Sequence, residues 1–577
     1  MFRKHTQHLQ TNYFDTHATL TPARQARLEQ SWAGVFYREL FCRIDEAPFA
    51  PLYVDVPSRP NTPINQLVGL EILKSGFGWS DEELFDHLQF DLQVRYALGI
   101  RDLTDEVCTL RTVYHFRRRV ADHMQTTGDN LFEQVFTQVT DAQLADLQVD
   151  THRQRMDSTQ IGSNIRQYSR LHLLVEVLQR AARMLTPADQ ERYAPQLQPY
   201  LRESAGHYCY RLKPGEYATQ LEPLGVLLGQ LLTDWAAVYA DHPAYQLLQR
   251  VFHEHFTVAA GEPATPITVK PAAELRASNL QSPDDPEATY RQKQGEGHWG
   301  YVLNATETCA PTNPVQLLTH LQLAPNTTDD EDLLIEAVPA LQARMPVTDL
   351  DLDGGYTGPE ATRVSTESHV RLHPTAIRGA QPDPDGVGLA DFVWEVTDET
   401  PAQVTCPHAQ TVPVQAGRAD DRYCAEFAAA TCATCPLRDR CPTTALSRRP
   451  VRVLRVSRRQ IAVAQLRRAC AETQHSPPHL RPAVEATMRS LKHPFGDERD
   501  QLPVRGQARV TMVLIAGGLM VNLRRIWRYR LAEAEKESKI AAEATPNSGV
   551  ISFVPREWCR WLGRLTRLPV AAAYLGC

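Results

Sequence analysis

One group of charged residues combines a carboxylate with two cations at a spacing that suits phosphate chemistry. Arg481, Glu485 and Lys492 are separated by offsets of four, seven and eleven residues. At about 100° per residue, these offsets place all three within roughly 60° on one face of a helix. A carboxylate between two cations can hold a metal ion beside a phosphate. A solvated face of salt bridges explains the same triplet, so its meaning depends on other acids in the chain.

Two aspartates stand at the ends of predicted strands, where the chain leaves a sheet. Asp157 lies near the end of an alternating segment, Leu147 to Ile161, and Asp353 follows the short apolar segment Val347 to Leu352. Ligands of open α/β sheets collect beyond the carboxyl ends of strands, and carboxylate oxygens suit hard cations such as Mg²⁺. Each aspartate alone could be a simple turn residue. Spacing does not exclude three neighbours as alternatives, namely Asp150, Asp349 and Asp351.

Taken together, these motifs resemble the DDE transposases of bacterial insertion sequences. The motifs are Asp157-Ser158-Thr159, Leu352-Asp353-Gly354-Gly355-Tyr356 and Arg481-x3-Glu485-x6-Lys492. The similarity is greatest to the group with an N-terminal helical domain and a cysteine cluster before the catalytic glutamate. Three further segments are similar to that group, namely Phe77 to Leu84, Phe116 to Arg119 and Asp285-Pro286-Glu287-Ala288. The resemblance runs from about residue 35 to residue 530.

The resemblance implies a ribonuclease-H-like core and an active site with two divalent ions, Mg²⁺ or Mn²⁺. Asp157, Asp353 and Glu485 would be the catalytic metal ligands, and Arg481 and Lys492 would contact DNA phosphates, a role that carries no sequence information.

The motif departs from the family pattern on either side of its arginine. Pro478 stands where the related motif often has a tyrosine, and Pro482 directly follows Arg481. Because proline is favoured in the first turn of a helix, we expect Arg481 to lie at the helix edge.

The activity that the resemblance implies is metal-dependent cleavage of DNA at the ends of an insertion sequence, followed by strand transfer into target DNA. The expected partners are double-stranded DNA, from element ends and target, and a second copy of the chain in a homodimer on DNA. Two alternatives remain open. One is a nuclease that cuts without strand transfer, and the other is a DNA-binding protein derived from a transposase that no longer cuts.

The cysteines form a second candidate site, for structural zinc. The chain has twelve cysteines, and a chain of this size does not need a disulfide framework. Cys432 and Cys435, three positions apart, can share one tetrahedral Zn²⁺, which takes two further ligands. The expected ligands are Cys406, Cys432, Cys435 and Cys441, with Cys424 and His408 as substitutes. Free thiols are the alternative.

The net charge of −7 conceals a strong asymmetry along the chain. Residues 438–530 contain twenty Lys or Arg against six Asp or Glu, a local balance of +14, so the rest carries −21. Such asymmetry fits a surface that faces a polyanion; the alternative is that these arginines pair with acidic parts of the same chain. We find no run of eighteen apolar residues and no apolar signal core. We therefore expect no membrane span and a cytoplasmic, nucleoid-associated protein.

Hydrophobic periodicity predicts an α/β fold in which a ribonuclease-H-like core is interrupted by a large helical insertion. An all-helical domain precedes this core, and a small cysteine-rich, zinc-ribbon-like insertion interrupts it again. The expected parts are an extension (1–60), a helical DNA-binding-type domain (61–140), the first core part (141–165), the helical insertion (166–270), the core (271–370), the cysteine-rich insertion (371–450), the core helices with Glu485 (451–533) and a tail (534–577).

Local signals place several elements within these parts. Ser80 and Glu83 have the spacing of a capping box at a helix start. Thr109 to Arg119 reads as a basic helix, for which DNA contact and a solvated surface are equal alternatives. The remaining helices are expected near Pro22–Leu40, Gln167–Phe256, Glu331–Met345, Gln460–Thr473, His479–Lys492 and Val504–Ala532, and a strand is expected at His298–Thr306.

Overall fold

The computed structural model describes most of the chain. Outside its description lie residues 1, 7, 9–14, 55, 57–59, 103, 214, 259–266, 294, 376–385, 398–399, 418–420, 475–481, 497–500 and 545–577, and the side chains of 469, 472–474, 482 and 541–544. The chain divides into two compact units, residues 1–527 and 528–577. The second unit contains the last part of one long helix, and all that follows concerns the first.

The N-terminal region is helical, as predicted. Its helices are α1 (Pro22–Gln30), α2 (Trp32–Glu39), α3 (Ile64–Phe77), α4 (Asp81–Phe90), α5 (Leu92–Ala97), α6 (Leu110–Thr127) and α7 (Leu131–Asp146). The capping box is confirmed, because the Ser80 hydroxyl accepts the N–H of Glu83 and the Glu83 carboxylate accepts the N–H of Ser80. Each of these two bonds satisfies a backbone donor that the start of α4 would otherwise leave unpaired.

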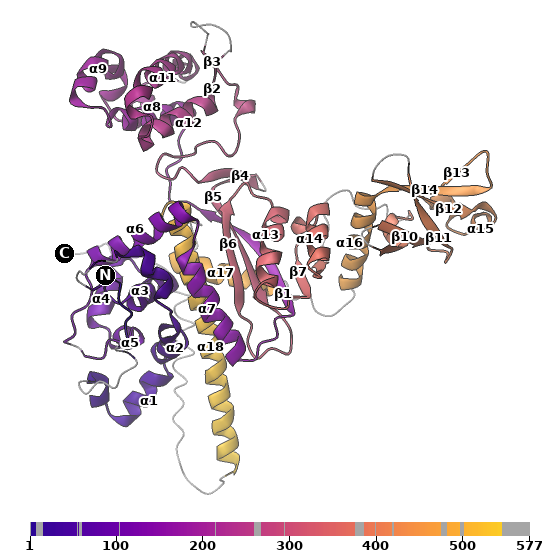
Figure 1. The fold of residues 1–577 in the computed structure, drawn as a ribbon, viewed down its shortest axis with the longest axis horizontal. Helices are drawn as coiled ribbons and strands as arrows, with labels where there is room; N and C mark the ends of the chain where they lie inside the picture. The colour runs from indigo at the N-terminus through magenta and orange to yellow at the C-terminus, as the bar shows by residue number, and fades with distance from the viewer. Residues whose placement is uncertain are drawn as a thin grey trace, which may run out of the picture. The chain divides into compact units, whose positions relative to one another are not determined.

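A mixed sheet follows the helical region (Figure 1). Its strands are β1 (Arg153–Gly162), β4 (Thr289–Lys293), β5 (Glu296–Thr308), β6 (Leu318–Pro325), β7 (Asp349–Leu352) and β8 (Arg371–Pro374). The order is β4-β5-β1-β7-β8, with β6 also paired to β5. Strand β1 runs antiparallel to β5 and parallel to β7. It begins later than the predicted Leu147, because the preceding residues form a turn in which Gln148 has a positive φ of 51°.

Successive side chains of a strand point to opposite faces of the sheet. Both faces of this sheet carry apolar side chains, and helices cover both. Val302 and the apolar residues of β7 pack with α13 (Asp330–Gln342) and α14 (Pro359–Glu367). Tyr301, Leu303 and Ala305, from the same strand β5, belong to the opposite core. That core joins the N-terminal helices to α17 (Pro482–Lys492) and α18 (Gln507–Ala544). Helix α17 therefore packs on the face of the sheet that carries Tyr301, Leu303 and Ala305.

Helix α18 is long and apolar enough to cross a membrane, by length and composition alone. However, 83% of its apolar window is buried inside the protein. Its apolar side chains, from Val510 to Leu523, belong to the core shared with the N-terminal helices. This is the behaviour of a core helix.

Between β1 and β4 the chain forms a helical region with a core of its own. The helices are α8 (Arg170–Ala182), α9 (Pro187–Leu201), α10 (Ala205–Tyr210), α11 (Tyr217–Tyr239) and α12 (Pro243–His255), followed by the hairpin β2 (Phe256–Val258) and β3 (Ile267–Val269). Trp235 and Leu228 are among the residues buried at its centre. The helices predicted between residues 167 and 256 are present.

The cysteine-rich region is built from strands that periodicity did not reveal. Its antiparallel sheet has the order β13-β14-β12-β11-β10-β9. The strands are β9 (Val393–Thr397), β10 (Thr400–Thr405), β11 (Thr411–Ala416), β12 (Arg422–Ala428), β13 (Thr444–Ala445) and β14 (Val451–Ser457), with α15 (Ala429–Ala433) between β12 and β13 and α16 (Arg458–Gln474) after β14. Phe392 and Phe427 are buried in a separate small core.

The basic helix α6 has one arginine that is not on a solvated face. Arg117 forms ion pairs with Glu71 at 2.7 Å and with Asp81 at 2.8 Å. Glu71 lies on α3 and is only 2% exposed. The Arg117 guanidinium therefore neutralises a carboxylate that the helical core has buried.

Replacing Arg117 with alanine should leave Glu71 as an uncompensated buried charge and lower the free energy of unfolding by about 3–5 kcal/mol. The measurement is denaturant unfolding followed by tryptophan fluorescence. The neighbouring Arg118 is exposed, so Arg118→Ala is a matched control that should change stability by less than about 0.5 kcal/mol. Equal losses in the two variants would contradict this assignment.

Candidate active site

The two predicted aspartates lie on neighbouring parallel strands. The pairing of β1 with β7 brings Arg155 opposite Asp351. Two residues further along each chain stand Asp157 and Asp353, and Asp353 still has an extended backbone. Because side chains two apart share a face of a sheet, the two carboxylates project from the same face. The prediction that Asp157 ends its strand is wrong, because β1 continues to Gly162 and Asp157 lies in its middle; Asp353 directly follows the end of β7.

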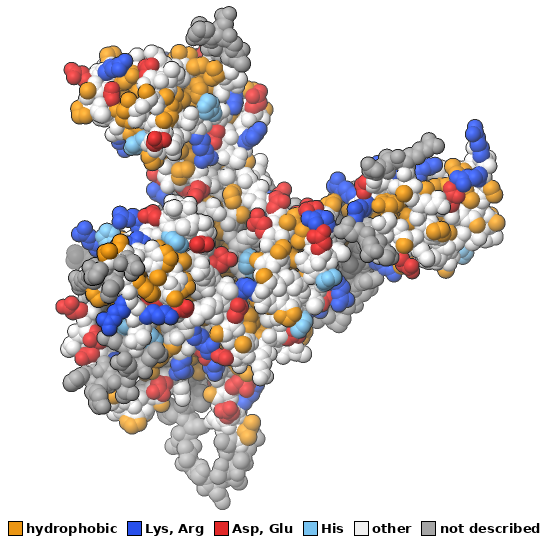
Figure 2. Space-filling view, in the orientation of Figure 1, with side chains coloured by type: hydrophobic (Ala, Val, Ile, Leu, Met, Phe, Trp, Pro, Cys, Tyr) orange, Lys and Arg blue, Asp and Glu red, His pale blue; other side chains and the backbone are white. Residues whose placement is uncertain are grey.

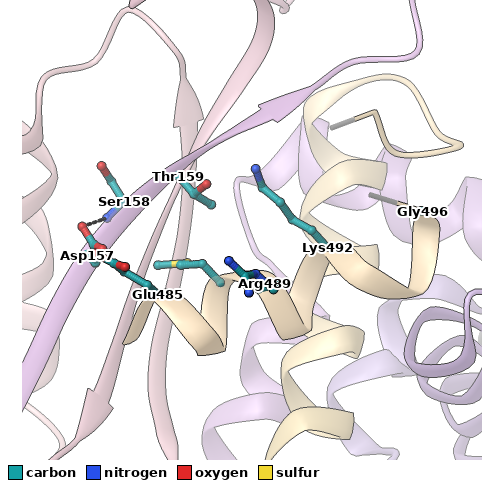
Figure 3. Close-up of a pocket in the computed structure, with 8 residues that line it drawn as sticks. Asp157, Ser158, Thr159, Glu485, Arg489, Lys492 and Gly496 are labelled. Atoms are coloured by element: carbon teal, nitrogen blue, oxygen red, sulfur yellow. Dashed lines mark hydrogen bonds between the residues drawn. The ribbon is translucent and has the colours of Figure 1, made fainter. Parts of the chain in front are cut away.

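Helix α17 supplies the third acid to a cavity that Asp157 also lines. The cavity has a volume of about 320 Å³, and its charged lining residues are Asp157, Glu485, Arg489 and Lys492. Figure 3 shows Asp157 and Glu485 close together at one end and Lys492 toward the other. One helix face thus presents a carboxylate and two cations to the strand that carries Asp157, as the spacing of Glu485 and Lys492 predicts.

Two predicted members of the site are not placed in this cavity. Arg481 lies outside the described residues. Asp353 is described, but it does not line the cavity; one of its oxygens accepts the N–H of Gly354 at 2.6 Å and caps a short 3₁₀ turn. Within the described part of the chain, no three His, Cys, Asp or Glu side chains are grouped as a metal site.

The three alternative aspartates are bound to other partners. Asp351 is 2% exposed and forms an ion pair with Arg153 at 2.8 Å. Asp349 accepts from His373 at 2.8 Å. The backbone N–H and ring of His152 lower the pKa of Asp150, which lies outside the sheet. The cavity therefore favours Asp157 over Asp150, but it does not separate Asp353 from Asp349 and Asp351, since none of these three lines it.

A polar cluster lies on the face of the sheet opposite to the side chain of Asp157. The Ser158 hydroxyl donates to Asp330 at 2.7 Å, and the Tyr356 hydroxyl donates to Asn304 at 2.9 Å. Burial raises the pKa of Tyr356 well above its usual range, and the carboxylates of Asp330 and Asp157 add to this effect. Tyr356 therefore remains a protonated donor beside the acids at every physiological pH.

Sequence reasoning missed one cation in the site. Arg489 is exposed and lines the cavity between Glu485 and Lys492. It follows Glu485 by four residues, so the same helical periodicity that places Lys492 on this face, seven residues after Glu485, also places Arg489 there. It was overlooked because it belongs to no recognised motif.

The four chosen cysteines surround one small cavity. Cys406, Cys432, Cys435 and Cys441 line a space of about 30 Å³, together with His408. Burial raises the pKa of the Cys432 thiol; nearby Arg452 opposes this, and the other three cysteines add to it. Cys424 lies on β12 and does not line the cavity. The four chosen cysteines thus line one space. Among the described residues, however, no three His, Cys, Asp or Glu side chains are close enough to form a metal-binding group.

Comparison with known protein families identifies two segments. Residues 405–527 match a family described as transposase DDE domain, and residues 25–119 match one described as transposase domain (DUF772). The chain is a transposase with a DDE domain and an N-terminal transposase domain. No curated protein and no solved structure matches it.

The matched segments contain only part of the candidate site. The DDE match includes Glu485, Arg489 and Lys492, and also the four cysteines. Asp157 and Asp353 lie outside both matches. In this transposase, strand pairing brings these two aspartates together, and Asp157 also shares the cavity with Glu485.

Replacing Arg489 with alanine should weaken DNA binding similarly for all sequences, because a phosphate contact is lost. The slope of log K against log salt should become less steep by about 1, measured by fluorescence anisotropy over a salt series. Arg363 is paired with Glu360 and Glu367 outside the site, so Arg363→Ala is the matched control. An unchanged slope in Arg489→Ala would exclude the phosphate contact.

Proposed function

We propose that this transposase cleaves DNA at the ends of an insertion sequence and joins the freed ends to target DNA in a metal-dependent reaction. The observation that carries the proposal is one cavity in which Asp157, from the middle of β1, and Glu485, from α17, lie beside Arg489 and Lys492. The two acids suit metal ions, and the two basic side chains suit the negative charge of a phosphodiester.

The proposed core is ribonuclease-H-like. Support comes from the mixed sheet, in which β1 is central, antiparallel to β5 and parallel to β7, and from the DDE-domain match. Asp157, Asp353 and Glu485 would be the ligands of Mg²⁺ or Mn²⁺, since hard cations take carboxylate oxygens. When bound, two such ions would activate the attacking oxygen and stabilise the leaving one.

The remaining residues of the cavity bind and orient the DNA. Arg489 and Lys492 would hold the phosphates that flank the scissile bond, and Arg481 would be a further contact of the same kind. Water attacks the phosphodiester at the element end and frees a 3′-hydroxyl. That hydroxyl then attacks a target phosphodiester, so one P–O bond breaks as another forms.

The partners proposed are double-stranded DNA and a second copy of the chain, because two element ends must be joined together. Such a protein would act on the nucleoid in the cytoplasm. A strand-transfer assay with Mg²⁺ and the flanking inverted repeats distinguishes the alternatives. Cutting without joining would indicate a nuclease, and binding without cutting would indicate a silent DNA-binding protein.

Replacing Asp353 with alanine should reduce DNA cleavage by at least about 100-fold, because even residues that only orient metal ligands contribute factors of 10 to 100. Cleavage rates are measured at saturating Mg²⁺ on a labelled element end. Asp150→Ala removes a nearby aspartate that contacts His152 instead, and it should cut normally. An Asp353→Ala protein as active as this control would disprove the assignment.

For the cysteine-rich region, we propose one structural Zn²⁺ bound by Cys406, Cys432, Cys435 and Cys441. Two neighbouring hydrogen-bond donors face two of these sulfurs. The N–H of Gln410 points to Cys406 Sγ at 3.4 Å, and the Thr443 hydroxyl points to Cys441 Sγ at 3.3 Å. Tetrahedral thiolate coordination leaves no open position, so this zinc would have no catalytic role.

Metal analysis of the purified protein should find one zinc per chain, and Cys435→Ser should lose it because one thiolate ligand is missing. Cys424→Ser is the matched control, since Cys424 lies on the same sheet but away from the cavity. Less than half an equivalent of zinc in the unmodified protein would rule out the site.

A further inference from the structure

A buried glutamate joins the strand and the helix that carry the proposed metal ligands. Glu307 lies on β5 and is 0% exposed. One carboxylate oxygen accepts from Arg155 Nε at 2.6 Å. The other accepts from the Thr487 hydroxyl at 2.8 Å and from Arg525 Nη1 at 2.6 Å. Three elements, β1, α17 and α18, therefore meet at this single side chain.

The partners of Glu307 stand next to the active site in sequence. Arg155 precedes Asp157 by two residues on β1, so the two share a face of the sheet. Thr487 follows Glu485 by two residues on α17. The same carboxylate thus holds the strand of one proposed ligand and the helix of the other, each within two residues of the reacting groups.

Apolar packing alone does not fix the position of α17. Val484, Met488 and Leu491 are buried on its inner side, but hydrophobic contact has no preferred direction. The Thr487 hydroxyl supplies the direction, because it donates to Glu307 and accepts from Arg525 Nη2. Hydrogen bonds require defined distances and angles, so this pair sets both the rotation of α17 and its position along its axis.

We propose that Glu307 is a positioning residue that sets the place of Glu485 relative to Asp157, acting through Thr487 and Arg155. The inference rests on the proposed metal-dependent function. Displacements of about 1 Å at an active site can cost about 100-fold in rate, so losing this link should weaken metal use.

Thr487 offers a cleaner test than Glu307, because removing the carboxylate would break the ion pairs of Arg155 and Arg525 at the same time. Thr487→Val preserves the shape and removes the hydroxyl. The Mg²⁺ concentration for half-maximal DNA cleavage should rise by about 10-fold or more, while DNA affinity stays unchanged. Thr487→Ser restores the hydroxyl and should return the metal dependence to normal.

The matched control is Thr511→Val. Thr511 is also a buried helical threonine, at 7% exposure, but its hydroxyl donates only to Gln507 O of its own helix at 2.8 Å. Both valine variants should show similar melting temperatures, and only Thr487→Val should change the metal dependence. Identical metal dependence in the two variants, or no recovery in Thr487→Ser, would overturn the positioning role.

A second readout does not require transposition. Fe²⁺ with ascorbate and peroxide generates hydroxyl radicals that cut the polypeptide beside a bound ion, and the full-length protein should be cut near residues 157 and 485. Thr487→Val should lose the cut near 485 and keep the one near 157.

Retention of both cuts would contradict the inference alone. Absence of both from the unmodified protein would reject the proposed metal site itself, and loss of both together with a lower melting temperature would show a merely structural role.

Discussion

The architecture depends on the buried carboxylate of Glu307, which accepts hydrogen bonds from three other parts of the chain. An unpaired charge in a protein interior costs several kcal/mol, so Glu307 is tolerable only when guanidinium and hydroxyl donors surround it. Arg155 comes from the same sheet, whereas Thr487 and Arg525 come from helices that enter the chain much later. Sheet and helices are therefore stabilised together, and the cavity with Asp157 and Glu485 is formed at their junction.

Local sequence signals predicted the elements of the site but not their assembly. The strand end before Asp353, the capping box of α4 and the charged face of α17 all follow from short-range sequence signals. The strand end predicted at Asp157 is wrong, because β1 continues to Gly162. The parallel register of β1 and β7 joins residues about two hundred positions apart, and no local pattern encodes it. Arg489 could have been found from its helical offset, whereas Glu307 could not, because its partners are brought to it only by folding.

The cysteine-rich region shows another limit of prediction from periodicity. Cys406, Cys432, Cys435 and Cys441, which spacing groups together, line one cavity. The surrounding strands were not predicted, because several are short and partly exposed, so apolar alternation is weak. A small core around Phe392 and Phe427 holds this sheet together, and its members come from both ends of the region.

The positive charge of residues 438–530 is divided between arginines paired within the chain and arginines exposed at the surface. Arg449, Arg505 and Arg525 form ion pairs with carboxylates of the same chain. Arg489 instead lies exposed in the cavity. On the face in Figure 2, basic side chains are interspersed with acidic ones rather than forming one continuous patch. We therefore expect that the attraction of DNA to this face depends more on the positions of individual basic side chains than on the net charge.

The order of the site along the chain also has a consequence for its synthesis. Asp157 is made more than three hundred residues before Glu485, and the helical insertion between β1 and β4 has its own core. Domains fold as units from the N-terminus during synthesis, at about 5–20 residues per second. The helical insertion can therefore fold while the cavity still lacks α17, and a growing chain carries an incomplete site for tens of seconds. A chain that ends before Glu485 lacks the acid that completes the cavity, so the proposed DNA cutting must wait until α17 has been made.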